Sequence, residues 1–286
     1  MNLRQTRKKI KSVTNVKKIT NAMEMISAIK MKKAQAEALE GRPYDEEIKK
    51  IISKIMPKVE SKFSPLLVEK ENLPVKKRLA LVVASNKGLC GGFNINLFRF
   101  INQNTDFANT DFIITGKKAV YLSRLGANII ADFSANNPMS NVSAIFNMAL
   151  EKYLNEGYFE IVLFYNKFIS VLKTEPTMTR ILPVKIEVPE AEVKDSKEPK
   201  DYLIEPAPEE IVDSLLRSYV QEAIKNSIIE SEASEHSSRM ISMKNATDNA
   251  THVIYNLTML RNKIRQENIT NELLDMVSAN ASVDVN

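Results

Sequence analysis

Small and apolar residues recur every three or four positions through the C-terminal part of the chain. The alternation of four and three residues includes Ile229, Ala233, His236, Met240, Met243, Thr247, Ala250, Ile254 and Leu257. A spacing of this kind, kept over four repeats, is typical of a coiled-coil seam. More apolar residues follow, namely Ile264, Ile269, Leu273, Leu274 and Val277. The pattern predicts one long helix over residues 209–286 that packs against another helix.

The N-terminal segment has a similar spacing. Its predicted seam comprises Ile10, Val13, Val16, Thr20, Met23 and Ser27, and further apolar residues off this line are Ile19, Met25, Ile26 and Ile29. A helix that is apolar on more than one side is expected to be surrounded on more than one side. We therefore predict an antiparallel pair of residues 1–56 with part of 209–286. The longer C-terminal helix would extend past its partner and would need something else to pack against.

The distribution of helix breakers favours the same arrangement. All seven glycines lie between Gly41 and Gly157, and all eleven prolines lie between Pro43 and Pro208. Residues 209–286 contain neither, and a helix of that length would measure about 115 Å at 1.5 Å per residue. Several ordinary helices joined by polar loops are the alternative.

The middle of the chain alternates between two other patterns. Short β-rich runs occupy Arg78–Ser85, Thr110–Thr115, Ala127–Phe133 and Tyr158–Asn166, and helical patterns occupy Ile95–Gln103, Lys117–Leu125 and Val142–Leu154. Such an alternation predicts βαβ units with a mostly parallel sheet. The fold class is therefore α/β, with an antiparallel coiled coil of long N- and C-terminal helices and a central Rossmann-like α/β domain over residues 75–190.

Two further runs, Phe168–Lys173 and Arg180–Val188, resemble strands and could add an antiparallel edge to the sheet. The segment Pro189–Glu210 is rich in proline and charge, which indicates an exposed connector. The expected segments are thus an N-terminal helix over 1–56, the domain over 75–190 and a C-terminal helix over 209–286.

A glycine-rich stretch, SNKGLCGGFN at Ser85–Asn94, directly follows the first predicted strand, where Rossmann and P-loop folds bind phosphate. The P-loop string G-x-x-x-x-G-K-[ST] does not occur in the sequence. The dinucleotide pattern started at Gly88 would need glycines where Cys90 and Phe93 stand. We interpret the stretch as a tight turn that lets strand and helix pack closely.

Other catalytic residue types are scarce. The sequence has one cysteine, Cys90, and two histidines, His236 and His252, which is too few for the usual tetrahedral zinc site. His236 lies on the predicted seam, where a packed and hydrogen-bonded histidine is expected. The strings G-x-S-x-G and H-E-x-x-H are absent from the sequence. We expect no catalytic residues, no cofactor, no metal and no small-molecule substrate.

Charge is distributed unevenly along the chain. Residues 1–33 carry ten lysines or arginines and one acid, Glu24, which is a net +9 against a total of +5 and leaves −4 for the remainder. A basic arm indicates a negatively charged partner. Nucleic acid and an acidic protein surface are both candidates. The apolar face of the arm and its lack of stacking aromatics favour a protein.

The N-terminus shows no short apolar signal region, and no stretch reaches the roughly 18 apolar residues that span a bilayer. A single cysteine excludes an internal disulfide and suits a reducing compartment. We expect a soluble protein that could still attach to a membrane complex.

Three long motifs carry a specific resemblance. They are TNVKKITNAMEMISAIKMKKAQ at Thr14–Gln35, KGLCGGFN at Lys87–Asn94, and ASEHSSRMISMKNATDNA with NKIRQENITNELLDMVS between Ala233 and Ser278. Their content and order closely resemble the gamma subunits of F-type ATP synthases, from one end of the chain to the other.

The resemblance implies a central rotor stalk. In that family the two end helices form an antiparallel coiled coil inside a 3:3 hexamer of alpha and beta subunits, and the α/β domain lies against the epsilon subunit and the membrane c-ring. Ion flow would turn the ring and the stalk, and the catalysis would belong to beta. The place implied is the cytoplasmic face of the bacterial plasma (inner) membrane, as a peripheral subunit.

Site residues follow from matching motif positions. The resemblance implies beta-subunit contacts at Lys18, Met23, Arg239, Gln266 and Thr270. It also implies contacts with the membrane ring and epsilon at Tyr202, Leu203 and Glu205.

The chain departs from the family in two places. SANASV at Ser278–Val283 replaces the usual Gly- and Ala-rich ending, and one cysteine cannot form the regulatory dithiol of chloroplast members. The second departure favours a bacterial-type complex. The alternative function is a basic helical scaffold or a nucleic-acid-binding protein.

Overall fold

The computed structural model describes most of the chain, and every structural statement below refers to that part: residues 2–56, 59, 63–68, 70, 76–135, 138–185 and 207–283. Two compact units are present. Unit 1 combines Met1–Ala28 with Arg239–Asn286, and unit 2 is Ile29–Ser238. The division into 1–56, 75–190 and 209–286 remains a prediction.

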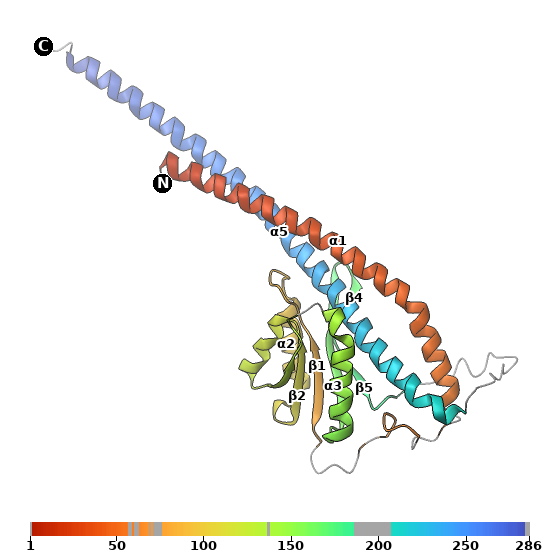
Figure 1. Ribbon diagram of the computed structural model, residues 1–286. Coiled ribbons are helices and arrows are strands. Elements are labelled where there is room, and N and C mark those ends of the chain that lie inside the picture. Colours follow the sequence, from red (N-terminus) through yellow and green to blue (C-terminus); the bar gives the residue numbers. More distant parts are fainter. Residues whose placement is uncertain are drawn as a thin grey trace. The chain divides into compact units, whose positions relative to one another are not determined.

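Two long helices run through the chain. Helix α1 spans Leu3–Ile55, and helix α5 spans the 76 residues Pro208–Val283 (Figure 1). The long C-terminal helix is confirmed, and the alternative of several helices joined by loops is wrong. Helix α5 begins at a proline and carries Glu209 and Glu210 in its first turn. Proline lacks only an N–H that has no partner there, and the acids interact favourably with the helix dipole.

Several hydroxyl residues of α5 are compatible with a helix because they bond back to it. Thr247, Thr251 and Thr258 each donate to the carbonyl four residues earlier, at 2.9, 2.9 and 2.8 Å. A hydroxyl satisfied in this way does not compete for the backbone groups of another conformation.

Helix α1 continues through Pro43, an interior position where proline normally costs a hydrogen bond. The carbonyl that loses its donor belongs to Leu39, and both residues are exposed. Water can therefore satisfy that carbonyl, which explains why the helix does not end there.

Five strands form one sheet in the order β3-β2-β1-β4-β5. Strands β1 to β4 are parallel and β5 pairs antiparallel to β4, which confirms a mostly parallel sheet with an antiparallel edge. The strand bounds are Arg78–Val83 for β1, Thr110–Thr115 for β2, Asn128–Asp132 for β3, Glu160–Ser170 for β4 and Lys173–Leu182 for β5.

The predicted separate strand at Phe168–Lys173 is wrong. Strand β4 continues to Ser170, and the hairpin turn follows before β5 begins at Lys173. An apolar run interrupted by Lys167 still alternates between two faces, so it continues one strand. The last three residues of the other predicted run, 186–188, lie outside the described residues.

Helices cover both faces of the sheet. Alternate strand residues such as Leu79 and Leu81 pack with α3 (Val142–Asn155), the start of α5 and the end of α1. Their neighbours Ala80 and Val82 face α2 and η4 instead. Helix α2 spans Phe93–Asn104 and η4 is a 3-10 helix over Lys117–Leu125, while η3 (Phe107–Asn109) and η5 (Pro138–Asn141) are short 3-10 turns. In the part of the chain that the structure describes, no helix is long and apolar enough to cross a membrane.

Candidate partner-binding surface

The N-terminal part of α1 presents a regular seam within unit 1. The heptad line of Leu3, Thr6, Ile10, Val13, Lys17, Thr20, Glu24 and Ser27 is buried or half-buried throughout, and Thr14, Met23 and Ala28 beside this line are half-buried as well. The predicted seam placed Val16 on this line, which is wrong, because Val16 is 49% exposed and Lys17 is half-buried instead. A strict heptad through Ile10 and Val13 reaches position 17, and the stem of a lysine can pack there while its ammonium reaches water.

The matching seam of α5 follows its predicted line. Met243 and Ala250 are buried, whereas Thr247, Ile254 and Leu257 are half-buried. The Oγ1 atoms of Thr20 and Thr247 are 2.8 Å apart and share a hydrogen bond. The two helices of unit 1 therefore meet through a seam that is partly polar.

Large apolar side chains also lie on the outside of α1. Val16, Ile19, Met25 and Ile26 are between 49% and 62% exposed. Exposed cations lie on the same helix, namely Arg4, Arg7, Lys8, Lys9, Lys11 and Lys18. Apolar side chains beside cations, on a helix already paired along its seam, form a surface suited to a partner that is apolar and acidic.

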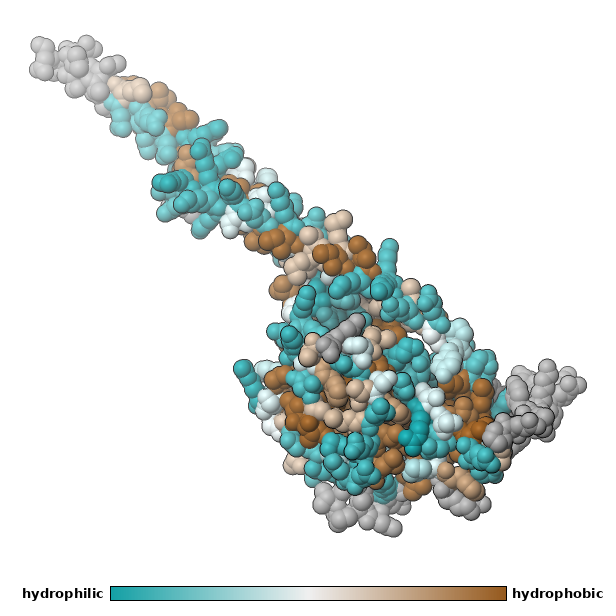
Figure 2. Space-filling view, viewed as in Figure 1, coloured by the Kyte–Doolittle hydropathy of each residue, from teal (hydrophilic) through white to brown (hydrophobic). Residues whose placement is uncertain are grey.

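The free end of α5 is a second exposed surface. Every residue from 265 to 277 is exposed, although Ile269, Leu273, Leu274 and Val277 are large and apolar. Within unit 1, α5 continues past the first residue of α1, and apolar side chains lie among polar ones along it (Figures 1 and 2). The predicted extension of the C-terminal helix beyond its partner is present.

The predicted beta-contact residues are differently accessible. Lys18, Gln266 and Thr270 are exposed, and Met23 is half-buried. Thr270 Oγ1 donates to the Gln266 carbonyl at 3.0 Å, which places this pair on one helical turn. Arg239 is only 6% exposed, so little of its side chain is available to a partner.

The predicted ring and epsilon contacts, Tyr202, Leu203 and Glu205, lie outside the described residues.

The glycine-rich turn after β1 is held by side chains. Asn94 Nδ2 donates to Ser85 Oγ at 2.8 Å and to Cys90 Sγ at 3.4 Å, and Asn94 Oδ1 accepts the Ser85 N–H at 3.2 Å. Gly91 adopts a φ of 58°, which favours glycine, whereas Gly88 has open space around it. No close packing around Gly88 therefore requires a glycine at that position.

Three serines of α5 meet the carboxyl edge of the sheet. Ser231 Oγ donates to the Val83 carbonyl of β1 at 3.5 Å, and Ser234 Oγ donates to the Asn166 carbonyl of β4 at 2.9 Å. Ser237 donates to the Val171 carbonyl in the β4–β5 turn. Strands β1 and β4 flank the point where the strand order reverses, which is where doubly wound folds take ligands. Here α5 covers it.

The sequence interpretation missed these serine contacts. Their spacing of three residues is visible in the sequence and places them on one helix face, but spacing alone does not show that this face meets the sheet.

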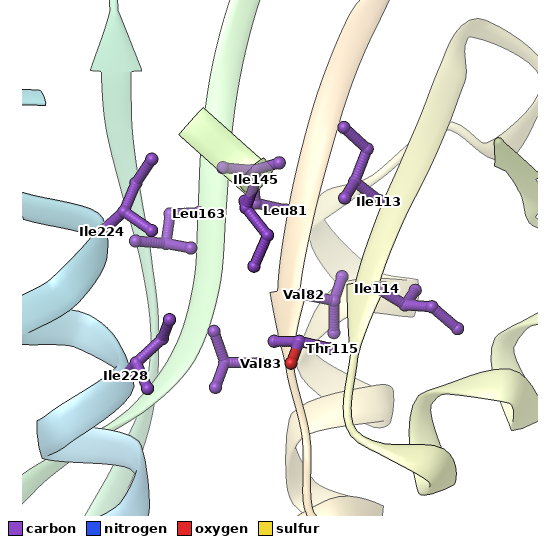
Figure 3. A pocket seen from close by; sticks show the side chains of 10 residues that line it. All are labelled: Leu81, Val82, Val83, Ile113, Ile114, Thr115, Ile145, Leu163, Ile224 and Ile228. Atoms are coloured by element: carbon purple, nitrogen blue, oxygen red, sulfur yellow. The ribbon is translucent and has the colours of Figure 1, made fainter. Parts of the chain in front are cut away.

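A small apolar hollow lies beneath the same region. It measures about 10 Å³, and side chains from β1, β2, β4, α3 and α5 surround it, including Val83, Leu163 and Ile228 (Figure 3). This is about the volume of one water probe, far below that of a ligand pocket. The hollow is a packing defect.

The single cysteine and the two histidines differ in their exposure. Cys90 is buried, His236 is half-buried and His252 is exposed. Among the described residues, no group of three or more His, Cys, Asp or Glu side chains could hold a metal ion.

Glu230 of α5 is a largely buried acidic residue in unit 2, with charged residues of α1 and β4 nearby. Burial raises the pKa of Glu230, and Asp45 of α1 raises it further, while Lys167, Arg42 and Lys49 act in the opposite direction. Glu230 Oε2 is buried without a hydrogen-bond partner among the described residues. The ionised carboxylate is therefore less stable here than in water.

Replacing Glu230 by glutamine should make the folding stability of the protein less dependent on pH. A raised carboxyl pKa in the folded state means that stability is greatest where the group is protonated. That contribution is lost as pH rises from the ordinary glutamate pKa through the raised one. Urea midpoints measured from about pH 4 to pH 8 should fall with pH less in E230Q than in the wild type. Glu151→Gln, at an exposed position, is the control, and an E230Q profile identical to the wild type would contradict this cause.

Comparison with known proteins places the chain in a family. A family model described as ATP synthase matches residues 2–283. The ATP synthase gamma chain of Glaesserella parasuis is 37% identical over 291 residues, which cover 98% of this chain and 99% of the relative. That of Nitrosomonas europaea is 35% identical over 292 residues, with the same shares covered.

Solved structures agree on the fold. One chain of the mitochondrial ATP synthase of Euglena gracilis, in rotational state 3, has a TM-score of 0.68 at 15% identity, covering 98% of this chain and 94% of that one. A chain from the central stalk and c-ring of the Tetrahymena thermophila enzyme has a TM-score of 0.57 at 22% identity, covering 80% and 99%. On its near-complete match to the family model and to full-length relatives, the chain belongs to the family of ATP synthase gamma chains.

Proposed function

We propose that this chain is the rotating central stalk of an F-type ATP synthase. It would transmit torque between an ion-driven membrane c-ring and a catalytic hexamer of alpha and beta subunits, and it would regulate the ATPase activity of that hexamer. The observation that supports this best is the free end of α5, where residues 265–277 are all exposed despite four large apolar side chains. Apolar surface of this kind favours a surrounding protein sleeve.

Torque transmission needs no active site in the stalk. A rotor changes the relative free energies of beta conformations by making different contacts with each of them, as any ligand does when it shifts a population. The chain would thus be a non-catalytic subunit, with ATP chemistry in beta. The serines of α5 that cover the carboxyl edge of the sheet support this assignment.

The proposed contacts follow the two exposed surfaces. Lys18 and Met23 would face an acidic loop of beta, which suits the net +9 of residues 1–33. Gln266 and Thr270, exposed on one turn of α5, would contact the beta sleeve, and Arg239 would join them only if its buried side chain were uncovered. Tyr202, Leu203 and Glu205 would meet the membrane ring and the epsilon subunit, which would place the chain at the cytoplasmic face of a bacterial membrane.

Reconstitution of the complex tests the function directly. Alpha, beta and epsilon subunits on a c-ring membrane preparation should show ATP-driven rotation and ion pumping only when this chain is added. Undiminished pumping without the chain would contradict the proposal. Substantial ATPase activity of the isolated chain would contradict its non-catalytic role.

Replacing Met23 by lysine should uncouple hydrolysis from pumping. The change adds a charge at a half-buried position of the proposed beta contact, which alters the contact energy differently in each rotary state. We expect ATP-driven ion pumping to fall several-fold while ATP hydrolysis persists. The control is Ala36→Lys, which adds the same charge at an exposed position of α1 in unit 2. Unchanged pumping in the Met23 variant would exclude this placement.

The alternative function, nucleic-acid binding by the basic arm, predicts a different result in affinity purification. Affinity purification of the tagged chain should recover alpha, beta and epsilon subunits. Recovery of nucleic acid without those subunits would favour the alternative.

A further inference from the structure

Unit 1 has a polar contact at the centre of its helix pair. The hydroxyl oxygens of Thr20 on α1 and Thr247 on α5 are 2.8 Å apart, and Thr20 is only 9% exposed. Each hydroxyl also lies within hydrogen-bond distance of a carbonyl of its own helix, Lys17 O at 3.1 Å and Met243 O at 2.9 Å. One threonine can therefore donate across the seam while the other donates to its own helix, and both hydroxyl protons are used.

The seam around this contact has few large apolar anchors. On α1 the neighbouring seam positions are Lys17 and Glu24, with the half-buried Met23 beside them, and on α5 they are Met243 and Ala250. Apolar side chains are what normally oppose sliding of one helix along another, and alternating small and polar side chains oppose it weakly. A heptad repeat is also compatible with a slide of seven residues, because every seam position then meets another seam position.

A slide by one heptad would break the threonine pair. The helices are antiparallel, so a slide would bring Thr20 opposite Met240 or Ile254 in place of Thr247. A thioether accepts hydrogen bonds weakly and an alkyl chain does not accept them. The hydroxyl pair therefore forms in the observed register and is lost from Thr20 in both neighbouring registers.

We propose that Thr20 and Thr247 form a register pin, a polar pair that favours the observed axial alignment of the two helices within unit 1, in addition to the anchoring that the end of α1 and the start of α5 receive in the core of unit 2. A single buried polar residue sets register in some coiled coils in the same way, at a cost in stability relative to an apolar pair. The pin is a positioning device. It lets the rest of the seam stay small and polar while the two helices keep one alignment.

Disulfide trapping in the full-length chain tests the pin. In a Cys90→Ser background, Ile10→Cys is combined separately with Leu257→Cys, Ile264→Cys and Ala250→Cys, all on the α5 seam. The antiparallel register set by Thr20 and Thr247 places Ile10 opposite Leu257. Ile264 and Ala250 lie one heptad away on either side, about 10.5 Å along the axis. That displacement exceeds the Cα separation that a disulfide bridges.

The measurement is the yield of slid disulfides relative to aligned ones under mild oxidation. Thr20→Val keeps the side-chain volume and removes the hydroxyl, so it should raise this ratio about two- to tenfold. Thr247→Val should act similarly, and the double variant should exceed neither single variant by much, because both remove the same bond.

Two matched variants separate the pin from a general effect. Thr20→Ser restores a hydroxyl and should return the ratio to the wild-type value. Thr14→Val removes a hydroxyl that bonds only to its own helix, at Ile10 O, and should leave the ratio unchanged. An unchanged ratio in Thr20→Val, or an equal rise in Thr14→Val, would overturn the proposal.

Discussion

Replacing Gly116 by alanine should destabilise unit 2 by about 3 kcal/mol. Gly116 follows β2 with a φ of 94°, a conformation that side chains with a Cβ rarely adopt. A Cβ there would lie 2.0 Å from the Ala84 carbonyl oxygen, which is backbone and cannot rotate away. The backbone is tied in place nearby, because Ala84 N donates to Thr115 O at 2.9 Å and Lys118 N donates to Ser85 O at 3.0 Å.

Urea unfolding followed by circular dichroism measures this effect. The control is Gly88→Ala in the neighbouring turn, where nothing lies within 4 Å of the added Cβ. We expect the midpoint of Gly88→Ala to stay close to that of the wild type. Equal midpoints for the two variants would show that the close approach at Gly116 is relieved at little cost.

Replacing Ser234 by leucine should destabilise unit 2 by about 2–4 kcal/mol. Ser234 is 0% exposed and its hydroxyl satisfies the Asn166 carbonyl. Leucine would need space where α5 lies against the carboxyl edge of the sheet, and it would leave that carbonyl without its donor. Ser234→Ala loses only the hydrogen bond, so its cost should be smaller, about 1 kcal/mol.

The same substitution elsewhere on α5 separates packing from helix propensity. Ser214→Leu lies at an exposed position, where the hydroxyl bonds only to Ile211 O of its own helix. Leucine is the better helix former, so we expect Ser214→Leu to be neutral or slightly stabilising. A Ser234→Leu midpoint as high as that of Ser214→Leu would exclude close approach as the reason for serine.

Local patterns predicted the elements well. The absence of glycine and proline predicted the long C-terminal helix, and the β-branched run Thr110–Thr115 predicted β2 with its observed bounds. Predicted strand ends were less accurate at β4, because apolar alternation cannot show where a hairpin turns. Val16 was misassigned because valine and lysine differ in hydropathy, whereas the heptad geometry selects position 17.

The candidate surface was only partly predictable. The sequence predicted that α1 is surrounded on more than one side, whereas Ile19 and Ile26 on its second apolar side are 60% and 56% exposed among the described residues. The Thr20–Thr247 bond and the burial of Glu230 involve residues far apart in sequence. Their partners are set by the alignment of two helices, and hydrophobic spacing leaves that alignment open by multiples of seven residues.

The sequence by itself determined the two long helices, the βαβ order of the centre and the basic arm, because these depend on local propensity, spacing and charge. Only the tertiary structure decided what the serines of α5 do. Ser231 and Ser234 lie at the point of strand-order reversal because the sheet brings β1 and β4 together there, although the paired residues Val82 and Phe164 are 82 positions apart in the sequence (164 − 82). A serine on a helix looks the same in sequence whether it faces water or a strand carbonyl, and packing between distant segments makes that choice.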